Sequence, residues 1–264
     1  MSQKLGQHFL KDKSVLKKIA TSLEIKKGDT IIEIGPGHGE LTELIAKELI
    51  AFSRKLILIE KDKELIPSLR KKFTNTNTFI IEDDILKVLQ QLVIDYKLQA
   101  ISYKLTGNIP YYITGQLLRI ISELKSKPEL CVFTIQKEVA ERIVAKPPKA
   151  NLLACAVQIW ANPKIIATIP AGAFNPPPKV TSAIIKLETK KEILDEKLLI
   201  NYFKMLHILF KQPRKTILNN LSEGLNINKA GIIAKLEKLG INPKNRPQNL
   251  EINDIIALSE IFIG

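Results

Sequence analysis

The segment Asn108-Ile109-Pro110-Tyr111 combines residue types that together could activate an aromatic amine. The Asn108 side-chain oxygen and a backbone carbonyl at Ile109 or Pro110 could accept the two N–H bonds of the exocyclic amine of adenine. This would shift electron density onto the nitrogen, so that positioning and electrostatics could promote its attack without a strong base. Tyr111 offers a flat face for stacking an extruded base. The alternative is a strand–helix turn that Asn and Pro merely cap.

A glycine-rich turn, Glu33-Ile34-Gly35-Pro36-Gly37-His38-Gly39, follows a predicted strand and precedes a predicted helix. Glycines such as Gly35 and Gly37 let a backbone approach a ligand closely. A dinucleotide site would have the spacing Gly-x-Gly-x-x-Gly, with a pyrophosphate at the helix N-terminus. Here the spacing is Gly-x-Gly-x-Gly, and Pro36 removes one N–H donor. The turn therefore predicts a cofactor without a pyrophosphate, unless it is a tight turn that binds nothing.

Two acidic residues end the next two predicted strands. Glu60 lies a little over twenty residues beyond the glycines, where a carboxylate can accept both ribose hydroxyls of a nucleoside. Asp84 could accept from an adenine amino group, although Asp83 beside it indicates that one of this pair is only a surface residue. Solvated strand ends are the alternative for both. With the glycine turn, Glu60 and Asp84 predict an S-adenosylmethionine site.

A proline-rich loop, Pro170–Val180, contains the last candidate for the site. Prolines make such a loop stiff and extended. Phe174, flanked by Ala173 and Asn175, is expected to be exposed unless it contacts something. Its ring would then form a second stacking wall opposite Tyr111, and the alternative is a core anchor for the loop.

These candidates need a scaffold that brings strand ends together, and the first 140 residues predict one. Buried β-like runs alternate with helical patterns there, which is typical of a mostly parallel, doubly wound sheet. The carboxyl ends of such strands form the usual ligand site. The predicted strands are Thr30–Ile34, Lys55–Ile59, Thr78–Ile81, Ile101–Leu105 and Leu130–Ile135. The predicted helices are one capped by Asp12 or Ser14, then Glu40–Ile50, Asp62–Phe73, Ile113–Ile121 and Lys137–Arg142.

The pattern changes after about residue 150. Leu152–Trp160 and Lys164–Ile169 are apolar and predicted to be extended, and Val180–Leu187 is a further strand, which fits a hairpin-like edge of the sheet. Beyond residue 190 the chain is predicted to be helical, with helices around Leu199–Phe210 and from Thr216, Asn228 and Ile252. We therefore predict a catalytic domain over 1–190 and a helical C-terminal domain over 191–264.

The charge of the chain favours a nucleic-acid partner. Its 264 residues carry a formal net charge of +13, with a sequence pI of about 9.6. Such a charge is the electrostatic footprint expected for RNA or DNA binding, with an anionic membrane surface or a merely solvated basic surface as alternatives. The best candidates for phosphate contacts are Lys179, Lys211, Arg214 and Lys215.

The remaining composition predicts a cytoplasmic protein without a metal. The N-terminus lacks the apolar core of a signal peptide, and no apolar run approaches the ~18 residues of a membrane span. Cys131 and Cys155 lie in apolar runs and are expected to be buried free thiols. Three histidines and two separated cysteines form no metal-ligand pattern.

Five motifs together resemble the ribosomal RNA adenine dimethyltransferases of the KsgA (RsmA) type. They are Gly6-Gln7-His8-Phe9-Leu10, Glu33–Gly37, Gly107–Tyr111, Phe174–Ala183 and Leu209–Thr216. The terminal Arg246-Pro247 segment is similar too, so the resemblance covers nearly the whole chain.

This resemblance implies a Rossmann-like S-adenosylmethionine-dependent methyltransferase domain followed by a smaller, all-helical domain that contacts rRNA. It implies dimethylation at N6 of two adjacent adenosines in the 3′-terminal hairpin loop of 16S rRNA. The partner would be the 30S subunit or its precursor, and a role in subunit biogenesis follows. The implied catalytic residues are Asn108, Pro110, Tyr111 and Phe174, and the implied cofactor contacts come from His8, Leu10, Gly35, Gly37, Glu60, Asp84 and Asn108.

Two departures from the family pattern stand out. His8 occupies a position where Asn is frequent, and Gln212-Pro213 lies where a further arginine is often found. The competing interpretations are an erythromycin-resistance methyltransferase acting on 23S rRNA and a ribosome-assembly factor without catalysis. A nicotinamide dehydrogenase is disfavoured by the glycine spacing. No dimerisation seam is evident, so a monomer is expected.

Overall fold

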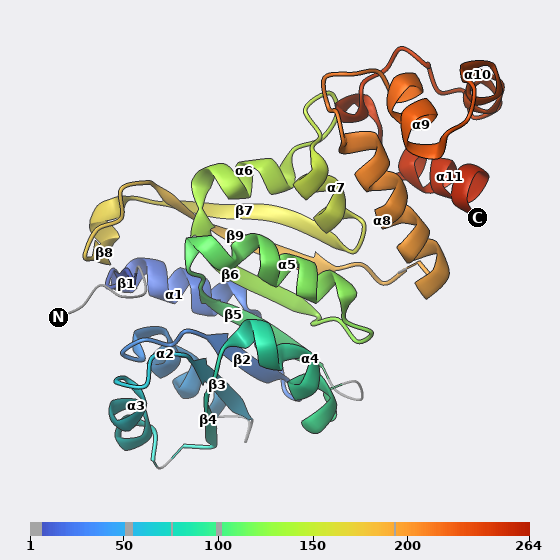
Figure 1. Ribbon diagram of the computed structural model, residues 1–264. Coiled ribbons are helices and arrows are strands. Elements are labelled where there is room, and N and C mark those ends of the chain that lie inside the picture. The colour runs from blue at the N-terminus through green and yellow to red at the C-terminus, as the bar shows by residue number, and fades with distance from the viewer. Residues whose placement is uncertain (1–6, 51–54, 75, 99–101, 193) are drawn as a thin grey trace. The chain divides into compact units, whose positions relative to one another are not determined.

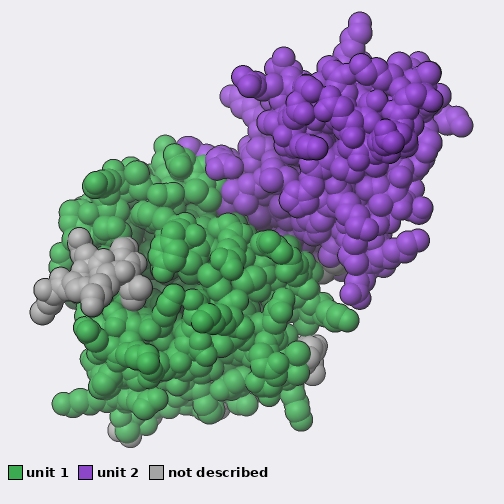
Figure 2. Space-filling model, in the orientation of Figure 1, with its two compact units in different colours: residues 1–140, 162–189 green, residues 141–161, 190–264 purple. Residues whose placement is uncertain are grey.

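A computed structural model describes residues 7–50, 55–74, 76–98, 102–192 and 194–264. The chain forms two compact units (Figure 2), one of residues 1–140 and 162–189 and the other of residues 141–161 and 190–264. The chain passes from the first unit to the second for the last time at residue 190, which is close to the predicted boundary. The segment 141–161, which the prediction placed in the first domain, groups with the second unit.

The first unit is built on a seven-stranded sheet whose order is β4-β3-β2-β5-β6-β9-β7 (Figure 1). The five strands from β4 to β6 are parallel, whereas β9 runs antiparallel to β6. The strand order reverses between β2 and β5, which makes this pair the switch point where doubly wound sheets bind ligands. The strands are β2 Thr30–Ile34, β3 Leu56–Glu60, β4 Thr78–Glu82, β5 Tyr103–Asn108, β6 Leu130–Gln136, β7 Ala161–Ile169 and β9 Ser182–Thr189.

Helices connect these strands, and local signals in the sequence explain where they begin. Asp12 caps α1, accepting from the backbone N–H groups of Ser14 and Val15 at 2.8 and 3.2 Å. Pro67 lies in the first turn of α3, where its missing N–H costs no helical hydrogen bond. The helices of this part are α1 Lys13–Ser22, α2 Glu40–Ile50, α3 Ile66–Lys72, α4 Ile85–Asp95 and α5 Thr114–Glu123.

Three sequence predictions need correction. Leu152–Trp160, predicted to be extended, contains helix α7, Leu152–Gln158, which Asn151 caps at its N-terminus. A short run that is apolar on all sides carries no periodicity that could separate helix from strand. Helix α4 was not predicted. Strand β5 continues to Asn108, three residues beyond its predicted end, and its predicted start at Ile101 lies outside the described residues.

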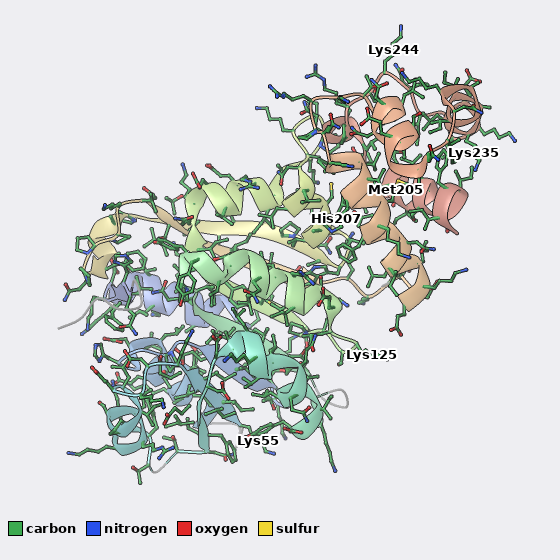
Figure 3. All side chains as sticks on the ribbon, viewed as in Figure 1. Lys55, Lys125, Met205, His207, Lys235 and Lys244 are labelled. Carbon is green, nitrogen blue, oxygen red and sulfur yellow. The ribbon has the colours of Figure 1, made fainter. Side chains whose placement is uncertain are left out.

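The second unit is helical, and the predicted helix starts agree with their caps. Thr216 and Asn228 accept hydrogen bonds from backbone N–H groups at the starts of α9 and α10. On α8, Met205 is buried and His207 is exposed (Figure 3), as two positions on opposite sides of an amphipathic helix must be. The helices are α7, α8 Glu196–Phe210, α9 Ile217–Leu225, α10 Lys229–Lys238 and α11 Ile252–Ile263; α6, Lys137–Val144, begins in the first unit.

Both cysteines are buried free thiols, as predicted. Burial raises the pKa of the Cys155 thiol to about 12 and that of Cys131 well above its ordinary value, so neither is a thiolate at neutral pH. Among the described residues, no helix is long and apolar enough to span a membrane.

Candidate active site

A cleft opens at the carboxyl ends of β2, β3 and β5, where the sequence places its candidate motifs. It encloses about 550 Å³ of space, part of which is open to solvent. Among the described residues, no lysine or arginine lines it, and Glu60 is the one acidic lining residue. The lining residues are Gln7, His8, Phe9, Gly35, Gly37, Glu60, Asn108, Ile109, Pro110 and Tyr111.

Asn108 ends strand β5 with its side-chain amide in one defined orientation. Its Nδ2 donates to the backbone carbonyl of His8 at 2.7 Å. A carbonyl oxygen can only accept, so the group facing His8 must be the NH₂ and not the amide oxygen. The Oδ1 atom is therefore left to accept from a ligand. This contact spans 100 positions of the chain.

The residues after Asn108 turn the chain tightly into α5. The Ile109 N–H donates to the Thr134 carbonyl at 3.0 Å, which ties the turn to β6. The Pro110 carbonyl accepts from the Ile113 N–H at 3.0 Å. Of the two carbonyls that the sequence suggested as a second acceptor, that of Ile109 is consequently the better candidate, because Pro110 already uses one lone pair.

Tyr111 lines the cleft with a half-buried ring, and its hydroxyl is held by a hydrogen bond. Its hydroxyl lies 2.8 Å from the Oγ atom of Ser182, a fully buried residue of β9. The His8 ring lies across from it, with centroids 6.3 Å apart and planes at 25°. Sequence reasoning did not assign a role to Ser182, although the residue lies within one of the family motifs.

The first described residues, 7–12, form a strap across the cleft, here called the N-terminal strap. Strand β1, Phe9–Leu10, pairs antiparallel with β8, Phe174–Asn175. The side chain of Gln7 donates to Asp62 at 3.0 Å. The His8 Nδ1 lies 2.8 Å from the Pro176 carbonyl and must carry the proton there. The strap thus joins the proline-rich loop to the cleft.

Glu60 lies at the end of β3, 5% exposed, and its carboxylate is aligned by backbone donors. The N–H of Gly37 reaches one oxygen at 3.1 Å and the N–H of Asp62 the other at 2.8 Å. Burial raises the pKa of this carboxyl, and the two N–H groups oppose that shift. Each oxygen retains a lone pair, so the carboxylate can still accept ribose hydroxyls.

Two glycines of the glycine turn, Gly35 and Gly37, line the cleft. Gly37 has a positive φ of 60°, and a Cβ built there would lie 2.9 Å from the Phe9 ring. Phe9 in turn packs on His38, with ring centroids 4.4 Å apart. A larger residue at position 37 would have to displace the Phe9 ring of the N-terminal strap, and this contact together with the positive φ favours glycine there.

Two predicted cofactor contacts lie outside this lining. Asp84 caps α4 by accepting from the Leu86 N–H at 3.0 Å, and it pairs with Lys61 at 2.9 Å. Burial alone would raise the pKa of Asp84, but the hydrogen bonds from Lys61 and Leu86 outweigh it and lower that pKa. Leu10 is buried and lines a smaller, adjoining cavity instead.

Phe174 is buried, which agrees with the alternative of a core anchor for the loop. Only 4% of the residue is accessible, and it belongs to a core cluster with Leu10 and Leu16. Its burial follows from the pairing of β8 with β1, which brings Leu10 opposite Phe174. Its proposed stacking on a base remains a prediction.

Glu33, near the end of β2, is a site-adjacent residue to which the sequence analysis gave no role. It is 2% exposed, lines the adjoining cavity, and accepts from the Thr42 hydroxyl at 2.7 Å. Burial raises the pKa of its carboxyl to about 8, helped by the nearby charges of Glu60 and Glu40. The signal available in the sequence was a carboxylate inside an otherwise apolar strand.

The predicted phosphate contacts lie on the surface. Lys179, Lys211 and Arg214 are exposed. Lys215 pairs with Glu223 at 2.7 Å, which offsets part of its charge. The backbone of the 211–216 turn is supported from α9, since Asn220 Nδ2 donates to the Gln212 carbonyl at 3.0 Å.

The cleft suits a cationic nucleoside better than a dinucleotide. A sulfonium cofactor carries a positive charge, and the described lining offers a carboxylate, an amide and aromatic faces, with no lysine or arginine among these residues. In the part of the chain that the structure describes, no group of three or more histidine, cysteine or acidic residues could hold a metal ion.

The fold and the cleft define a Rossmann-like methyltransferase. A family model described as ribosomal RNA adenine dimethylase matches residues 1–263, so the chain belongs to this family and is an rRNA adenine dimethyltransferase. The predicted fold class and family are thereby confirmed.

Known proteins resemble the chain over almost its full length. A protein of Dehalococcoides mccartyi (strain CBDB1) named ribosomal RNA small subunit methyltransferase A is 41% identical over 98% of this chain and 88% of its own. One of Clostridium botulinum (strain Okra / Type B1) with the same name is 39% identical, over 98% and 93%.

Among solved structures, a dimethyladenosine transferase from Plasmodium falciparum has a TM-score of 0.80 at 27% identity, covering 95% of this chain and 96% of that one. The 23S rRNA methyltransferase ErmE has a TM-score of 0.74 at 22% identity, covering 97% of this chain and 100% of that one, which shows a shared fold.

Proposed function

We propose that this enzyme transfers methyl groups from S-adenosylmethionine to N6 of two adjacent adenosines in the 3′-terminal hairpin of small-subunit rRNA. The observation that carries the proposal is the orientation of the Asn108 amide. The His8 carbonyl holds its NH₂ group at 2.7 Å, so the Oδ1 atom is available to accept from an adenine amine in the cleft.

In this proposal the chain activates the amine by hydrogen bonding. Asn108 Oδ1 and the Ile109 carbonyl accept the two N–H bonds of the adenine, which directs the nitrogen lone pair toward the methyl donor. Tyr111, anchored by Ser182, stacks on the base. The bound cofactor supplies an electrophilic methyl group, and Glu60 holds its ribose hydroxyls.

Two of the predicted cofactor contacts, Leu10 and Asp84, do not line the cleft directly. Leu10 is a residue of β1, and its pairing with Phe174 fixes this strand beside the cleft. The Asp84 carboxylate already accepts from the start of α4 and pairs with Lys61, so a cofactor would be its third partner. We retain both as proposed contacts of the adenosine end of the cofactor site.

The choice of the small subunit rests on the relatives and on the surface. The curated relatives quoted above are named for small-subunit methylation. The Ala171–Pro178 loop and the Phe210–Thr216 turn, which resemble those of the small-subunit enzymes, favour the same substrate over 23S rRNA. We propose that the helical region 191–264 contacts rRNA of the 30S particle or its precursor through exposed cations such as Lys211 and Arg214.

The test is incubation with radiolabelled S-adenosylmethionine and small subunits that lack the dimethylation, followed by mapping of the labelled nucleotides. We expect label at two adjacent adenosines of the 3′-terminal hairpin, as N6,N6-dimethyladenosine. Large subunits from the same cells are the matched control substrate. Label confined to 23S rRNA would assign the erythromycin-resistance activity, and no label in either subunit would favour a non-catalytic assembly factor.

A further inference from the structure

Lys104 is a buried cation on β5 to which the proposed reaction gives no role. Its side chain is 1% exposed, and the three protons of its ammonium group have three acceptors. The Nζ atom lies 2.7 Å from an Asp29 carboxylate oxygen, 3.0 Å from the Leu23 carbonyl and 2.6 Å from the Glu24 carbonyl. A buried charge is costly without such partners, so these contacts hold the ammonium group in one place.

Two of these acceptors lie at the end of helix α1. Leu23 is the C-cap of α1, and Glu24 follows it with a left-handed φ of 47°. The last carbonyls of a helix have no partner within the helix, and a cation beside them also matches the helix dipole. Lys104 therefore caps α1 from another element. The Glu24 carboxylate adds a second contact, with Lys186 of β9 at 2.7 Å.

Strand β5 also holds the chain ahead of α1. Asn108, four residues after Lys104, donates to the His8 carbonyl, which precedes the helix. Residues an even number apart point to the same face of a strand, and four residues span about 13 Å. Helix α1 has ten residues and is therefore about 15 Å long. Strand β5 thus binds the segment 8–24 at two points of matching separation, one on each side of α1.

The N-terminal strap and α1 are packed as one body. Leu10 of the strap belongs to the same buried cluster as Leu16 and Ile19 of α1, and the cluster includes Val132 of β6. Only two residues separate β1 from the first residue of α1. A shift of α1 along β5 would therefore move the strap and the His8 carbonyl with it.

We propose that Lys104 is a positioning residue for methyl transfer, which fixes the end of α1 on β5 and thereby fixes the N-terminal strap over the cleft. Lys104 is absent from the described lining of the cleft and of the adjoining cavity, so its effect on the reaction is transmitted through α1. This inference rests on the proposed function, because the strap orients the Asn108 amide through the His8 carbonyl.

Two variants isolate the contact between Lys104 and α1. Asp29→Asn removes the charge pair and leaves the Lys104 ammonium group to donate to both helix carbonyls. The double variant Lys104→Met/Asp29→Asn removes those donors as well, and it folds without an unpaired buried charge. Ile121→Ala, which opens a cavity beneath α5, is the control for lowered stability alone.

Hydrogen–deuterium exchange of residues 9–16 reports on the strap directly, since the Lys11 N–H donates to the Ala173 carbonyl at 2.8 Å. We would also measure kcat with undermethylated small subunits and the Kd of S-adenosylmethionine, at a temperature below every unfolding midpoint. We expect the double variant to lose exchange protection in the strap. Its kcat should fall by up to ~10²-fold, the cost of a misplacement of about 1 Å.

The Kd of S-adenosylmethionine should rise in the double variant too, because strap residues line the cleft. Asp29→Asn and Ile121→Ala should retain the strap protection and the kcat of the parent protein. Equal strap exchange in the double variant and in Asp29→Asn would overturn the inference. An equal loss in Ile121→Ala would also overturn it, because lowered stability alone would then explain the effect.

The exchange measurement needs no rRNA, so it separates this inference from the proposed function. Parent protein that methylates no small subunit would refute the proposed function. Loss of strap protection in the double variant alone would still support the anchoring of α1 by Lys104. Active parent protein with unchanged kcat and strap exchange in the double variant would refute the role of Lys104 and leave the proposed function intact.

Discussion

At the scale of single residues, the chemistry depends on the direction of one amide. Asn108→Ala removes the Oδ1 acceptor together with the hydrogen bond from Nδ2 to the His8 carbonyl. We expect kcat for methylation to fall by ~10²–10³-fold, the usual cost of removing one group that stabilises charge in a transition state. Cofactor affinity should fall much less than kcat, because Glu60 and the glycine turn keep their contacts. Single-turnover methylation and calorimetric titration with S-adenosylmethionine measure the two quantities.

Asn253→Ala on α11 is the control, since it removes an exposed asparagine far along the chain. Asn108→Asp adds a sharper comparison. A carboxylate cannot donate to the His8 carbonyl, so this variant should lose the oriented acceptor as well. Turnover near that of the parent protein in either Asn108 variant would contradict the amide mechanism.

The buried carboxyl of Glu33 predicts a pH dependence of stability. Burial raises its pKa in the folded state from 4.5 to about 8, so between these values the folded protein binds more protons than the unfolded chain. The free energy of unfolding should therefore decrease as the pH rises from about 4.5 to about 8. Glu33→Gln, which mimics the neutral form, should remove this decrease, which amounts to up to a few kcal/mol over the whole range.

Urea unfolding at pH 5.5 and pH 8, followed by circular dichroism, measures this slope. Glu64→Gln removes an exposed carboxylate of the same chemistry and serves as the control. A slope that is the same in Glu33→Gln and in the parent protein would show that Glu33 is ionised in the folded state across this range.

At the scale of elements, the position of Asn108 depends on how closely β5 approaches β2. Gly107 is the register partner of Ile34, and a Cβ built on it would lie 2.3 Å from the Ile34 carbonyl oxygen. Gly107→Ala must push the two strands apart and move Asn108. We expect a loss of roughly 1–3 kcal/mol in stability, typical of overpacking, together with reduced kcat.

Gly115→Ala on α5 is the matched control for this substitution. Nothing lies within 4 Å of a Cβ built at Gly115, and the residue is helical and exposed. Alanine there should be neutral or stabilise the protein by up to ~1 kcal/mol. Thermal unfolding of both variants decides the matter, and an unshifted midpoint in Gly107→Ala would refute the close-approach argument.

At the scale of the whole molecule, the net charge of +13 predicts a salt-dependent encounter with the ribosomal particle. Cations that neutralise phosphates release counterions, so the affinity for small subunits should fall linearly with the logarithm of salt concentration. Lys211→Ala and Arg214→Ala should each reduce the slope by about 1. Filter binding between 50 and about 200 mM salt measures the slope.

Lys55→Ala is the control for charge alone. Lys55 (Figure 3) is exposed and precedes β3, at the edge of the sheet opposite the carboxyl ends that form the cleft. Its removal changes the net charge by the same amount without touching the proposed RNA surface. Equal slopes for Lys55→Ala and Lys211→Ala would mean that the charge acts without a defined contact.

Much of this protein is determined by its sequence alone. Helix caps such as Asp12, Thr216 and Asn228 act on backbone N–H groups two or three residues away, so the sequence locates these helix starts. The glycine turn and the Asn108–Tyr111 segment are likewise contiguous, and their resemblance to family motifs, together with the alternation of strands and helices, predicted the fold and the family. Where the local signal was ambiguous, as in α7, the sequence prediction was wrong.

Only the tertiary structure decided how distant segments meet. The Asn108 amide is oriented by the backbone of His8, one hundred positions earlier. Phe174 is buried because β8 pairs with β1, and Asp84 is drawn into a cap and an ion pair with Lys61. The pKa of Glu33 depends on what surrounds its strand in three dimensions. Burial and hydrogen-bond partners are properties of contacts between distant parts of the chain, and residue types and spacing do not specify them.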